Sequence, residues 1–175
     1  MKRRACAMNK AFTKETETEE ALPEFVDALP PGMKNYMTPE GAARLKDELS
    51  QLRDVERPKL IKAKEDAPAK KRLREVDQRI QFILQRLQII EVVDPSRQKN
   101  QDEVFFGATV TYVDGAGAEH TVRIVGVDEA RTEAGEVSWV APIAQALNGA
   151  GEGDMVKLFS PSGIEELEIL KVEYL

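Results

Sequence analysis

The 175-residue sequence predicts an α+β protein, in which an antiparallel α-helical coiled-coil hairpin precedes a small antiparallel β-sheet domain with one short helix. In the first half, apolar residues recur at intervals of three and four, as on the face of a helix that packs against a partner. A short turn-like run interrupts this pattern at residues 65–69. After residue 102 the apolar period becomes two, which is typical of strands.

The first 37 residues mix charges with Thr, Pro and Gly and show no sustained period. We therefore expect a flexible N-terminal arm over residues 1–37. Met8 is as suited as Met1 to be the start of translation, which would make residues 1–7 dispensable.

The hairpin is predicted to begin at Thr38, because Thr caps helices and the following Pro39 suits the first helical position. Within the first arm, Pro58 removes one backbone hydrogen bond and crowds the preceding turn, so we expect a bend or loosening at Arg57-Pro58. The second arm should start near Pro68 and end at Asp94-Pro95, because a residue before proline is pushed out of helical geometry.

A continuous apolar seam predicts that the two arms pack on each other. It comprises Leu45, Leu49, Leu52 and Leu60 in the first arm, and Leu73, Val76, Ile80, Ile83, Leu87 and Ile90 in the second. If the chain folds back at Ala67, the two stripes satisfy each other as an antiparallel coiled coil. The predicted hairpin thus spans residues 38–95, with its tip (residues 65–69) at the far end.

A small β domain is predicted over residues 102–175. Expected strands cover residues 108–113, 119–127, 136–140, 155–160 and 164–174. Gly-containing turns separate most of them, and Pro142 begins a short helix over residues 142–147 that should pack on the sheet.

Composition excludes several classes of protein. A single cysteine, Cys6, allows no internal disulfide or zinc site, and no apolar run approaches the length of a membrane span. His120 is the only histidine, so no Ser-His-Asp or Cys-His constellation exists. We expect a cytoplasmic monomer that contacts no membrane, is not an enzyme, has no cofactor of its own and binds no metal stably.

The net charge of −6 divides unevenly along the chain. Residues 56–90 carry ten Lys and Arg against five acids, a net +5, whereas residues 102–175 carry four against fourteen, a net −10. The two halves therefore present electrostatic potentials of opposite sign to a partner. A protein that binds duplex DNA would more often be basic throughout.

Glu65 and Asp66 are adjacent carboxylates at the hairpin tip, and only a turn lets both approach one cation. One interpretation is that they are solubilising acids, with Asp66 capping the second arm. The other is that the hairpin delivers them to a hard metal ion in a partner's active site, where they complete a shell that the partner supplies.

Cations surround these acids, and they also allow two interpretations. They could simply solvate a coiled-coil surface, or they could form a basic shaft that follows nucleic acid or lines an acidic channel. The candidate RNA or channel contacts are Arg57, Lys62, Lys64, Lys70, Lys71, Arg72 and Arg74. Trp139 alternates with Val137 in a strand and is either a core residue or part of a partner surface.

Several ordered motifs resemble the Gre family of bacterial transcript-cleavage factors, closest to its GreB branch. They are YMTPEG at 36–41, ERP at 56–58, KKRLREVD at 70–77, VFFGATV at 104–110, RIVGVDE at 123–129, SWVAPIA at 138–144, EGD at 152–154 and VEY at 172–174. Together they span residues 36–175.

The resemblance implies an N-terminal coiled coil followed by a C-terminal domain of FKBP-like topology. It further implies a transcription elongation factor whose β domain binds RNA polymerase, through Trp139, Pro142 and Ile143 in this chain. The hairpin would enter the secondary channel, near the nascent RNA, and its tip acids would help to place Mg²⁺ in the polymerase active site. The polymerase would then hydrolyse the backtracked transcript, and the factor would remain an accessory protein.

The sequence departs from the family at the tip. Where relatives carry a longer hairpin that ends in Asp-x-x-Glu-Asn, this chain passes from Lys64 through Glu65 and Asp66 directly to Lys70. About a dozen residues are missing, or ~9 Å of reach when divided over two arms at 1.5 Å per residue. This departure keeps open a second function, a polymerase-binding modulator that does not stimulate cleavage. A peptidyl-prolyl isomerase is suggested only by the FKBP-like topology, and the sequence shows no aromatic-lined proline pocket.

Overall fold

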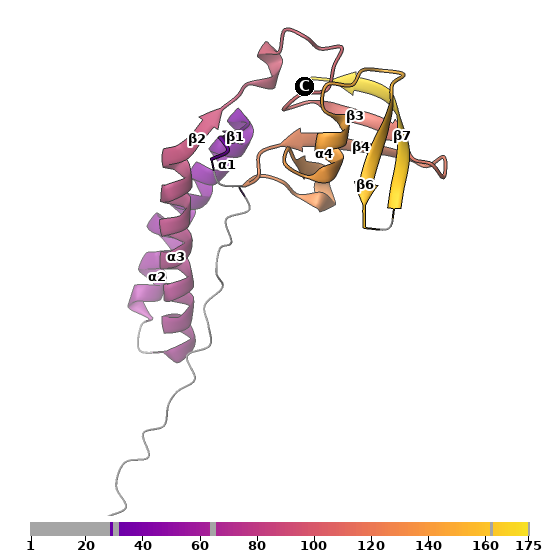
Figure 1. Ribbon diagram of the computed structural model, residues 1–175. Coiled ribbons are helices and arrows are strands. Elements are labelled where there is room, and N and C mark those ends of the chain that lie inside the picture. The colour runs from indigo at the N-terminus through magenta and orange to yellow at the C-terminus, as the bar shows by residue number, and fades with distance from the viewer. Residues whose placement is uncertain (1–28, 30–31, 64–65, 162, 175) are drawn as a thin grey trace, which may run out of the picture.

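The computed structural model describes residue 29 and residues 32–63, 66–161 and 163–174. A helical hairpin projects from one side of a domain built mainly from strands, and the two meet near the base of the hairpin (Figure 1). The predicted α+β class is therefore confirmed. No helix within the described ranges is long and apolar enough to cross a membrane.

The first arm begins as predicted. Helix α1 (Pro39–Ser50) has Thr38 as its N-cap, and the Thr38 hydroxyl accepts a hydrogen bond from the amide of Gly41 at 3.0 Å. Pro39 occupies the first helical turn, where its missing N–H costs nothing because that amide would have no intrahelical partner. After α1 the arm continues as a π-helical segment (Gln51–Glu56) and then as α2 (Arg57–Lys62).

The π-helical segment ends at Glu56, two residues before Pro58, and it agrees with the irregularity expected at Arg57-Pro58. The amide of Arg57 donates to the carbonyl of Leu52, five residues earlier, instead of four. A proline ring crowds the turn that precedes it in a regular α-helix, and a wider turn relieves that crowding.

The second arm ends earlier than predicted. Helix α3 (Ala67–Ile89) stops five residues before Asp94, and β2 (Ile90–Val92) follows it. Ile90 has extended backbone angles, φ −70° and ψ 140°, because β2 pairs in parallel with β1 (Asn35–Met37). The amide of Val93 extends this ladder by donating to the carbonyl of Met37 at 2.9 Å.

This pairing also corrects the N-terminal arm. Residues 35–37 were expected to be flexible, but they form β1 and are held by β2. Residues 1–28, 30 and 31 lie outside the described ranges, so the expectation for the rest of the arm stays a prediction.

Except for Leu73, the members of the apolar seam pack into or against one cluster, as the coiled-coil pattern predicted. Its buried members form a cluster with residues from the base of the hairpin: Met37, Ala42, Leu45, Leu49, Leu52, Val76 and Ile83. Leu60, Ile80, Phe82, Leu87 and Ile90 pack against this cluster while partly exposed. No residue of α2 is buried, so the apolar core ends before the distal part of the hairpin.

The β domain is one five-stranded sheet with the order β5-β4-β3-β7-β6. Its strands are β3 (Thr109–Val113), β4 (Glu119–Val125), β5 (Glu136–Ser138), β6 (Met155–Ser160) and β7 (Gly163–Glu173). The prediction of a purely antiparallel sheet is wrong in one place, because β4 and β5 pair in parallel. The connection between them includes a 3₁₀ turn (Thr132–Ala134). It is long enough to bring the chain back alongside β4, so that β5 can run parallel to it.

Helix α4 (Pro142–Leu147) has the predicted bounds and lies against the sheet (Figure 1). Ala144 and Leu147 of this helix join a core that includes Val110, Ile124 and Ile169 from the strands. The segment between the hairpin and the sheet contains a second 3₁₀ turn (Pro95–Arg97). The C-terminal Tyr174 hydroxyl holds this segment by donating to the carbonyl of Glu103 at 2.7 Å.

Candidate functional site

Only one of the two candidate acids at the hairpin tip is among the described residues. Asp66 lies at the N-cap of α3 and is exposed, whereas Glu65 and Lys64 fall outside the described ranges. The Asp66 carboxylate makes no capping hydrogen bond within the described chain, and its backbone carbonyl accepts from the amide of Lys70 at 3.1 Å. The interpretation of Asp66 as a side-chain cap is therefore wrong, and the carboxylate remains directed to solvent.

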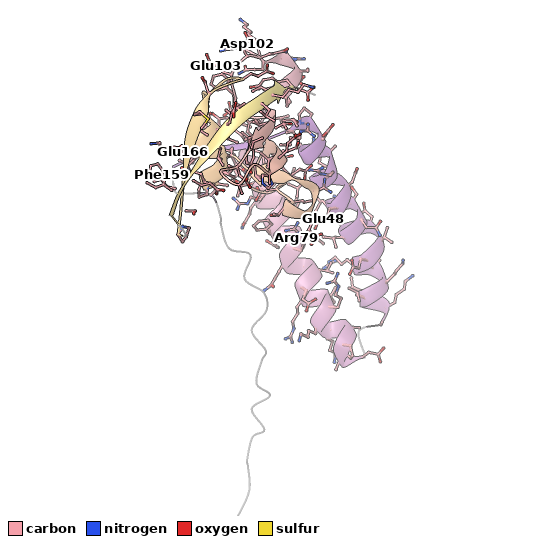
Figure 2. The ribbon with its side chains drawn as sticks, turned by 90° about the vertical axis from the view of Figure 1, so that its right-hand side faces the viewer. Glu48, Arg79, Asp102, Glu103, Phe159 and Glu166 are labelled. Atoms are coloured by element: carbon pink, nitrogen blue, oxygen red, sulfur yellow. The ribbon has the colours of Figure 1, made fainter. Side chains whose placement is uncertain are left out.

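Several arginines of the hairpin join the two arms. Arg57 pairs with Asp77 across the hairpin at 2.6 Å, and Arg72 pairs with Glu56 at 2.7 Å. Nearer the base, Arg79 makes two hydrogen bonds to Glu48, at 2.7 and 2.9 Å, and Figure 2 shows these side chains facing each other. The hydrogen bond to Glu56 also raises the pKa of Arg72 above its ordinary value. These arginines therefore help to hold the arms together.

Lysines carry the exposed charge of the distal hairpin. Lys59, Lys62 and Lys70 are exposed and form no ion pair with any residue that the structure describes. Lys71 and Arg74 are also exposed, and both have partners. Of the six candidate channel contacts that the structure describes, Lys62 and Lys70 are thus the ones whose charge is open to a partner.

The three candidate docking residues lie close together at the start of α4. Trp139 follows β5, and its amide donates to the carbonyl of Val125 at 2.9 Å. Pro142, in the first turn of α4, is exposed, while Ile143 is partly buried against the core. Their role in docking to a polymerase stays a prediction.

An aromatic pocket adjoins the docking residues. The Trp139 ring lies 5.4 Å from the Tyr36 ring in an edge-to-face arrangement, and Phe106 lies 5.8 Å from Tyr36. These rings border a cavity of about 330 Å³, which Ile124, Ala144, Gln145 and Asn148 also line. The indole Nε1 of Trp139 is buried and has no hydrogen-bond partner among the described residues. The sequence did not reveal this pocket, because its three rings come from separate segments of the chain.

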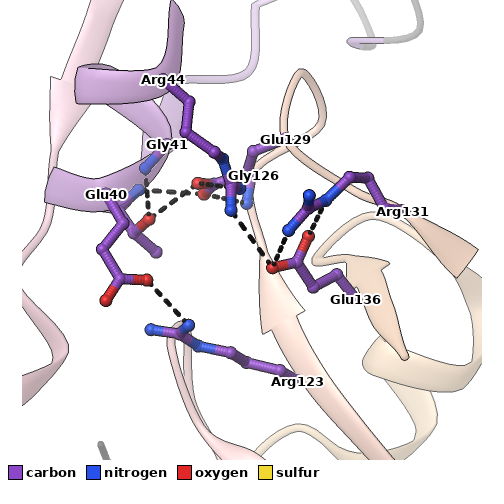
Figure 3. Close-up of polar contacts among 9 residues, drawn as sticks. Glu40, Gly41, Arg44, Arg123, Gly126, Glu129, Arg131 and Glu136 are labelled. Carbon is purple, nitrogen blue, oxygen red and sulfur yellow. Dashed lines mark hydrogen bonds and ion pairs between the residues drawn. The ribbon is translucent and has the colours of Figure 1, made fainter. Parts of the chain in front are cut away.

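The hairpin and the β domain meet through buried carboxylates. Glu129, in the turn after β4, accepts hydrogen bonds from the Thr38 amide at 2.9 Å, the Thr38 hydroxyl at 2.7 Å and the Gly126 amide at 2.7 Å (Figure 3). Its side chain is 2% exposed, and Arg44 approaches it at 3.8 Å. A carboxylate at the N-terminus of α1 also complements the positive end of the helix dipole.

The neighbouring residue contacts the other arm. Asp128 pairs with Arg86 of α3 at 3.1 Å, and both side chains are less than one tenth exposed. Asp128 also accepts a hydrogen bond from the Asn35 side chain in β1 at 2.8 Å. Two consecutive acids of one turn thus hold both arms of the hairpin.

A second set of charges surrounds this contact. Glu136 of β5 accepts two hydrogen bonds from Arg131, at 2.8 and 3.1 Å, and lies 3.5 Å from Arg44 (Figure 3). The Arg131 hydrogen bond holds the pKa of Glu136 below its ordinary value. Arg123 of β4 pairs with Glu40 of α1 at 2.9 Å.

Sequence reasoning named candidates at the tip and near α4 but missed this junction. The signal was present, because Gly126, Asp128 and Glu129 belong to one of the family motifs, but nothing local shows that their partners lie some 90 residues earlier. Within the described chain, no group of three or more His, Cys, Asp or Glu is arranged to hold a metal ion.

Two family profiles match the chain. The profile described as "Transcription elongation factor, N-terminal" matches residues 35–70. The profile described as "Transcription elongation factor, GreA/GreB, C-term" matches residues 98–174. Together they cover the greater part of the sequence.

Curated relatives extend this similarity. Transcription elongation factor GreB of Neisseria meningitidis strain Z2491 is 46% identical over 155 residues, covering 81% of this chain and 95% of the relative. Transcription elongation factor GreA of Alkalilimnicola ehrlichii is 41% identical over 152 residues, covering 79% of this chain and 96% of the relative.

Solved structures superpose only loosely. A GreA/GreB transcription elongation factor from Nitrosomonas europaea is 23% identical with a TM-score of 0.38, covering 81% of this chain and 99% of that protein. GreA factor homolog 1 of Thermus thermophilus is 20% identical with a TM-score of 0.37 and the same coverage. At these values the structural likeness carries no argument about function.

Proposed function

The chain belongs to the GreA/GreB family of transcription elongation factors, and on that premise we propose that it binds bacterial RNA polymerase at the secondary channel and stimulates cleavage of backtracked transcripts. Cleavage would release an arrested complex by generating a new RNA 3′ end. The polymerase itself carries out the hydrolysis with its own Mg²⁺, and this factor supplies groups that position the reactants.

One observation carries the proposal: a projecting hairpin ends in an exposed carboxylate and is anchored to a separate β domain. Helix α3 has 23 residues, which corresponds to about 35 Å at 1.5 Å per residue. Asp66 lies at its distal end with no internal partner for its side chain among the described residues. This architecture suits a device that reaches into a deep channel while the β domain stays outside.

The charges of the two parts support the same division. Lys62 and Lys70 present open cations near the tip, where nascent RNA or acidic channel walls would lie. The strongly acidic β domain would be repelled by nucleic acid and would instead contact protein.

The aromatic pocket supports docking to protein. Aromatic side chains with a free N–H group are frequent at the centres of protein interfaces. A polymerase side chain that enters the pocket would contact the rings of Tyr36, Phe106 and Trp139. Exposed Pro142 would lie at the rim of the same contact, beside partly buried Ile143.

A modulator that binds polymerase without stimulating cleavage is the second candidate. The short tip favours it, because the match to the N-terminal family profile ends at residue 70, immediately after the tip. A metal ligand must be placed to within about 0.5 Å, so a hairpin ~9 Å short would fail unless the β domain docks closer to the channel. In either case we propose a cytoplasmic monomer with no cofactor of its own.

The experiment adds the purified protein to a backtracked elongation complex with Mg²⁺ and measures the release of short 3′ RNA fragments and polymerase binding. We expect stimulation that the Glu65→Ala/Asp66→Ala variant loses. The control, Glu165→Ala/Glu166→Ala, removes two adjacent acids from β7 and should retain it. Binding without stimulation would select the modulator, and absence of binding by the unsubstituted protein would overturn both candidates.

A further inference from the structure

We propose that Glu129 is a positioning residue for transcript cleavage, because its buried carboxylate sets the angle at which the hairpin leaves the β domain. The inference rests on the proposed function, since it concerns where the hairpin tip is held. Glu129 lies at the opposite end of the hairpin from Asp66 and touches no reacting group.

The contacts of Glu129 are directional. Both carboxylate oxygens are used: Oε1 accepts from the amides of Thr38 and Gly126, and Oε2 accepts from the Thr38 hydroxyl. Thr38 is also the N-cap of α1, since its hydroxyl accepts from the Gly41 amide. A chain of hydrogen bonds therefore runs from the first turn of the hairpin through Thr38 to the turn of the β domain.

The hairpin and the β domain approach each other closely at two glycines of this contact. A Cβ atom added to Gly41 would lie 1.7 Å from Glu129 Oε2, and one added to Gly126 would lie 2.3 Å from the Tyr36 carbonyl oxygen. Atoms this close would have to separate, so the two glycines permit the hairpin to approach the turn. Backbone and carboxylate are thus in direct contact on both sides of the junction.

Two anchoring points are needed to define a direction, and the turn provides both. Glu129 holds the start of α1, while Asp128 holds α3 through Arg86. Both ion-paired side chains in the second contact are almost completely buried, so solvent screens them weakly. The two arms are consequently fixed to one short segment of the β domain.

A small change of angle at the junction becomes a large displacement at the tip. From Thr38 to Ala63 the first arm spans 26 residues and 25 rises, or about 37 Å at 1.5 Å per rise. A rotation of about 5° would then move the tip by roughly 3 Å, several times the ~0.5 Å that a catalytic group tolerates. Docking through Pro142 should be affected less than the placement of the tip, because none of the hydrogen bonds of Glu129 involves that residue.

The test compares Glu129→Gln with Glu133→Gln, which makes the same change at an exposed acid nearby. The amide nitrogen of Gln cannot accept the bonds that the carboxylate accepts, so only the first variant should loosen the junction. Spin labels on cysteines introduced at Lys70 and Glu119, in a Cys6→Ser background, report the distance between the distal hairpin and the β domain. Cleavage is measured at saturating factor, together with the concentration that gives half the maximal rate.

We expect the distance distribution of Glu129→Gln to broaden or shift by several ångströms, and its saturating cleavage rate to fall about tenfold or more. The half-maximal concentration should change less than about threefold. A wild-type distance distribution in this variant, or a broadened one with an unchanged saturating rate, would overturn the inference.

Asp128→Asn provides a second variant that loosens the other arm, with far-UV circular dichroism confirming that each protein is folded. Its saturating cleavage rate should also fall, while its half-maximal concentration should change little. A variant that loses only polymerase binding would contradict the inference. Absence of stimulation by the unsubstituted protein would overturn the proposed function, whereas the distance measurement needs no polymerase and still decides whether Glu129 fixes the hairpin.

Discussion

Replacing Ile83 by Ala should destabilise the hairpin far more than replacing its neighbour Leu84. Ile83 is 0% exposed at the centre of the seam, whereas Leu84 is 45% exposed on the same helix. Ala at position 83 removes three buried carbons, worth about 2.4 kcal/mol of transfer free energy at ~0.8 kcal/mol each. The cavity that remains adds to this, so we expect a loss of about 3–4 kcal/mol in the free energy of unfolding.

Leu84→Ala is a matched control. Both substitutions install the same residue at adjacent helical positions, so the gain in helix propensity is a few tenths of a kcal/mol in each. Because Leu84 already contacts solvent, its loss should be below about 1 kcal/mol. Urea unfolding followed by circular dichroism at 222 nm measures both values, and the melting temperature of Ile83→Ala should fall by roughly 6–16 °C. Equal losses for the two variants would show that the seam is not the core of the hairpin.

Three further predictions concern the junction and the shaft. Gly126→Ala, whose new Cβ would meet the Tyr36 carbonyl, should lower stability by about 1–3 kcal/mol in thermal unfolding, while Gly115→Ala in an open turn should not. Because Arg131 lowers the pKa of folded Glu136, the stability that this carboxylate adds should be complete above its ordinary pKa of 4.5 and should decline as the pH falls through the lowered pKa. An acid titration should therefore show the difference in free energy of unfolding between wild type and Glu136→Gln shrinking as the pH falls. A constant difference would contradict this prediction. Lys62→Glu/Lys70→Glu should weaken polymerase binding several-fold at low salt and less at high salt. The control Lys99→Glu should leave binding unchanged, and equal effects of the two variants would argue against a basic shaft.

Local features of the sequence were sufficient for the elements whose causes lie within one turn. Thr38 and Pro39 predicted the start of α1 because capping involves only the next three residues. Pro142 likewise predicted α4, and the alternating residues 155–160 predicted β6 with its observed bounds. The irregularity before Pro58 also follows from the chemistry of a single residue.

The remaining features of the fold and of the candidate site depend on contacts between residues that are distant in the sequence. Ile90 continues the helical spacing of the seam, yet it begins a strand because β1, some 55 residues earlier, offers a backbone ladder. In the candidate site, Arg57 and Arg72 looked like open cations until the fold placed Asp77 and Glu56 beside them. The aromatic pocket similarly needs Tyr36, Phe106 and Trp139 from three separate segments.

The sequence by itself therefore determined most of the helices and strands, where the hairpin turns and which family motifs the chain carries. Only the tertiary structure decided which charges remain open and how the hairpin is joined to the β domain. The physical reason is range: capping, proline geometry and apolar periodicity act between neighbouring residues. Glu129 acquires its role from Thr38, which lies 91 residues away in the chain and within hydrogen-bonding distance in the fold.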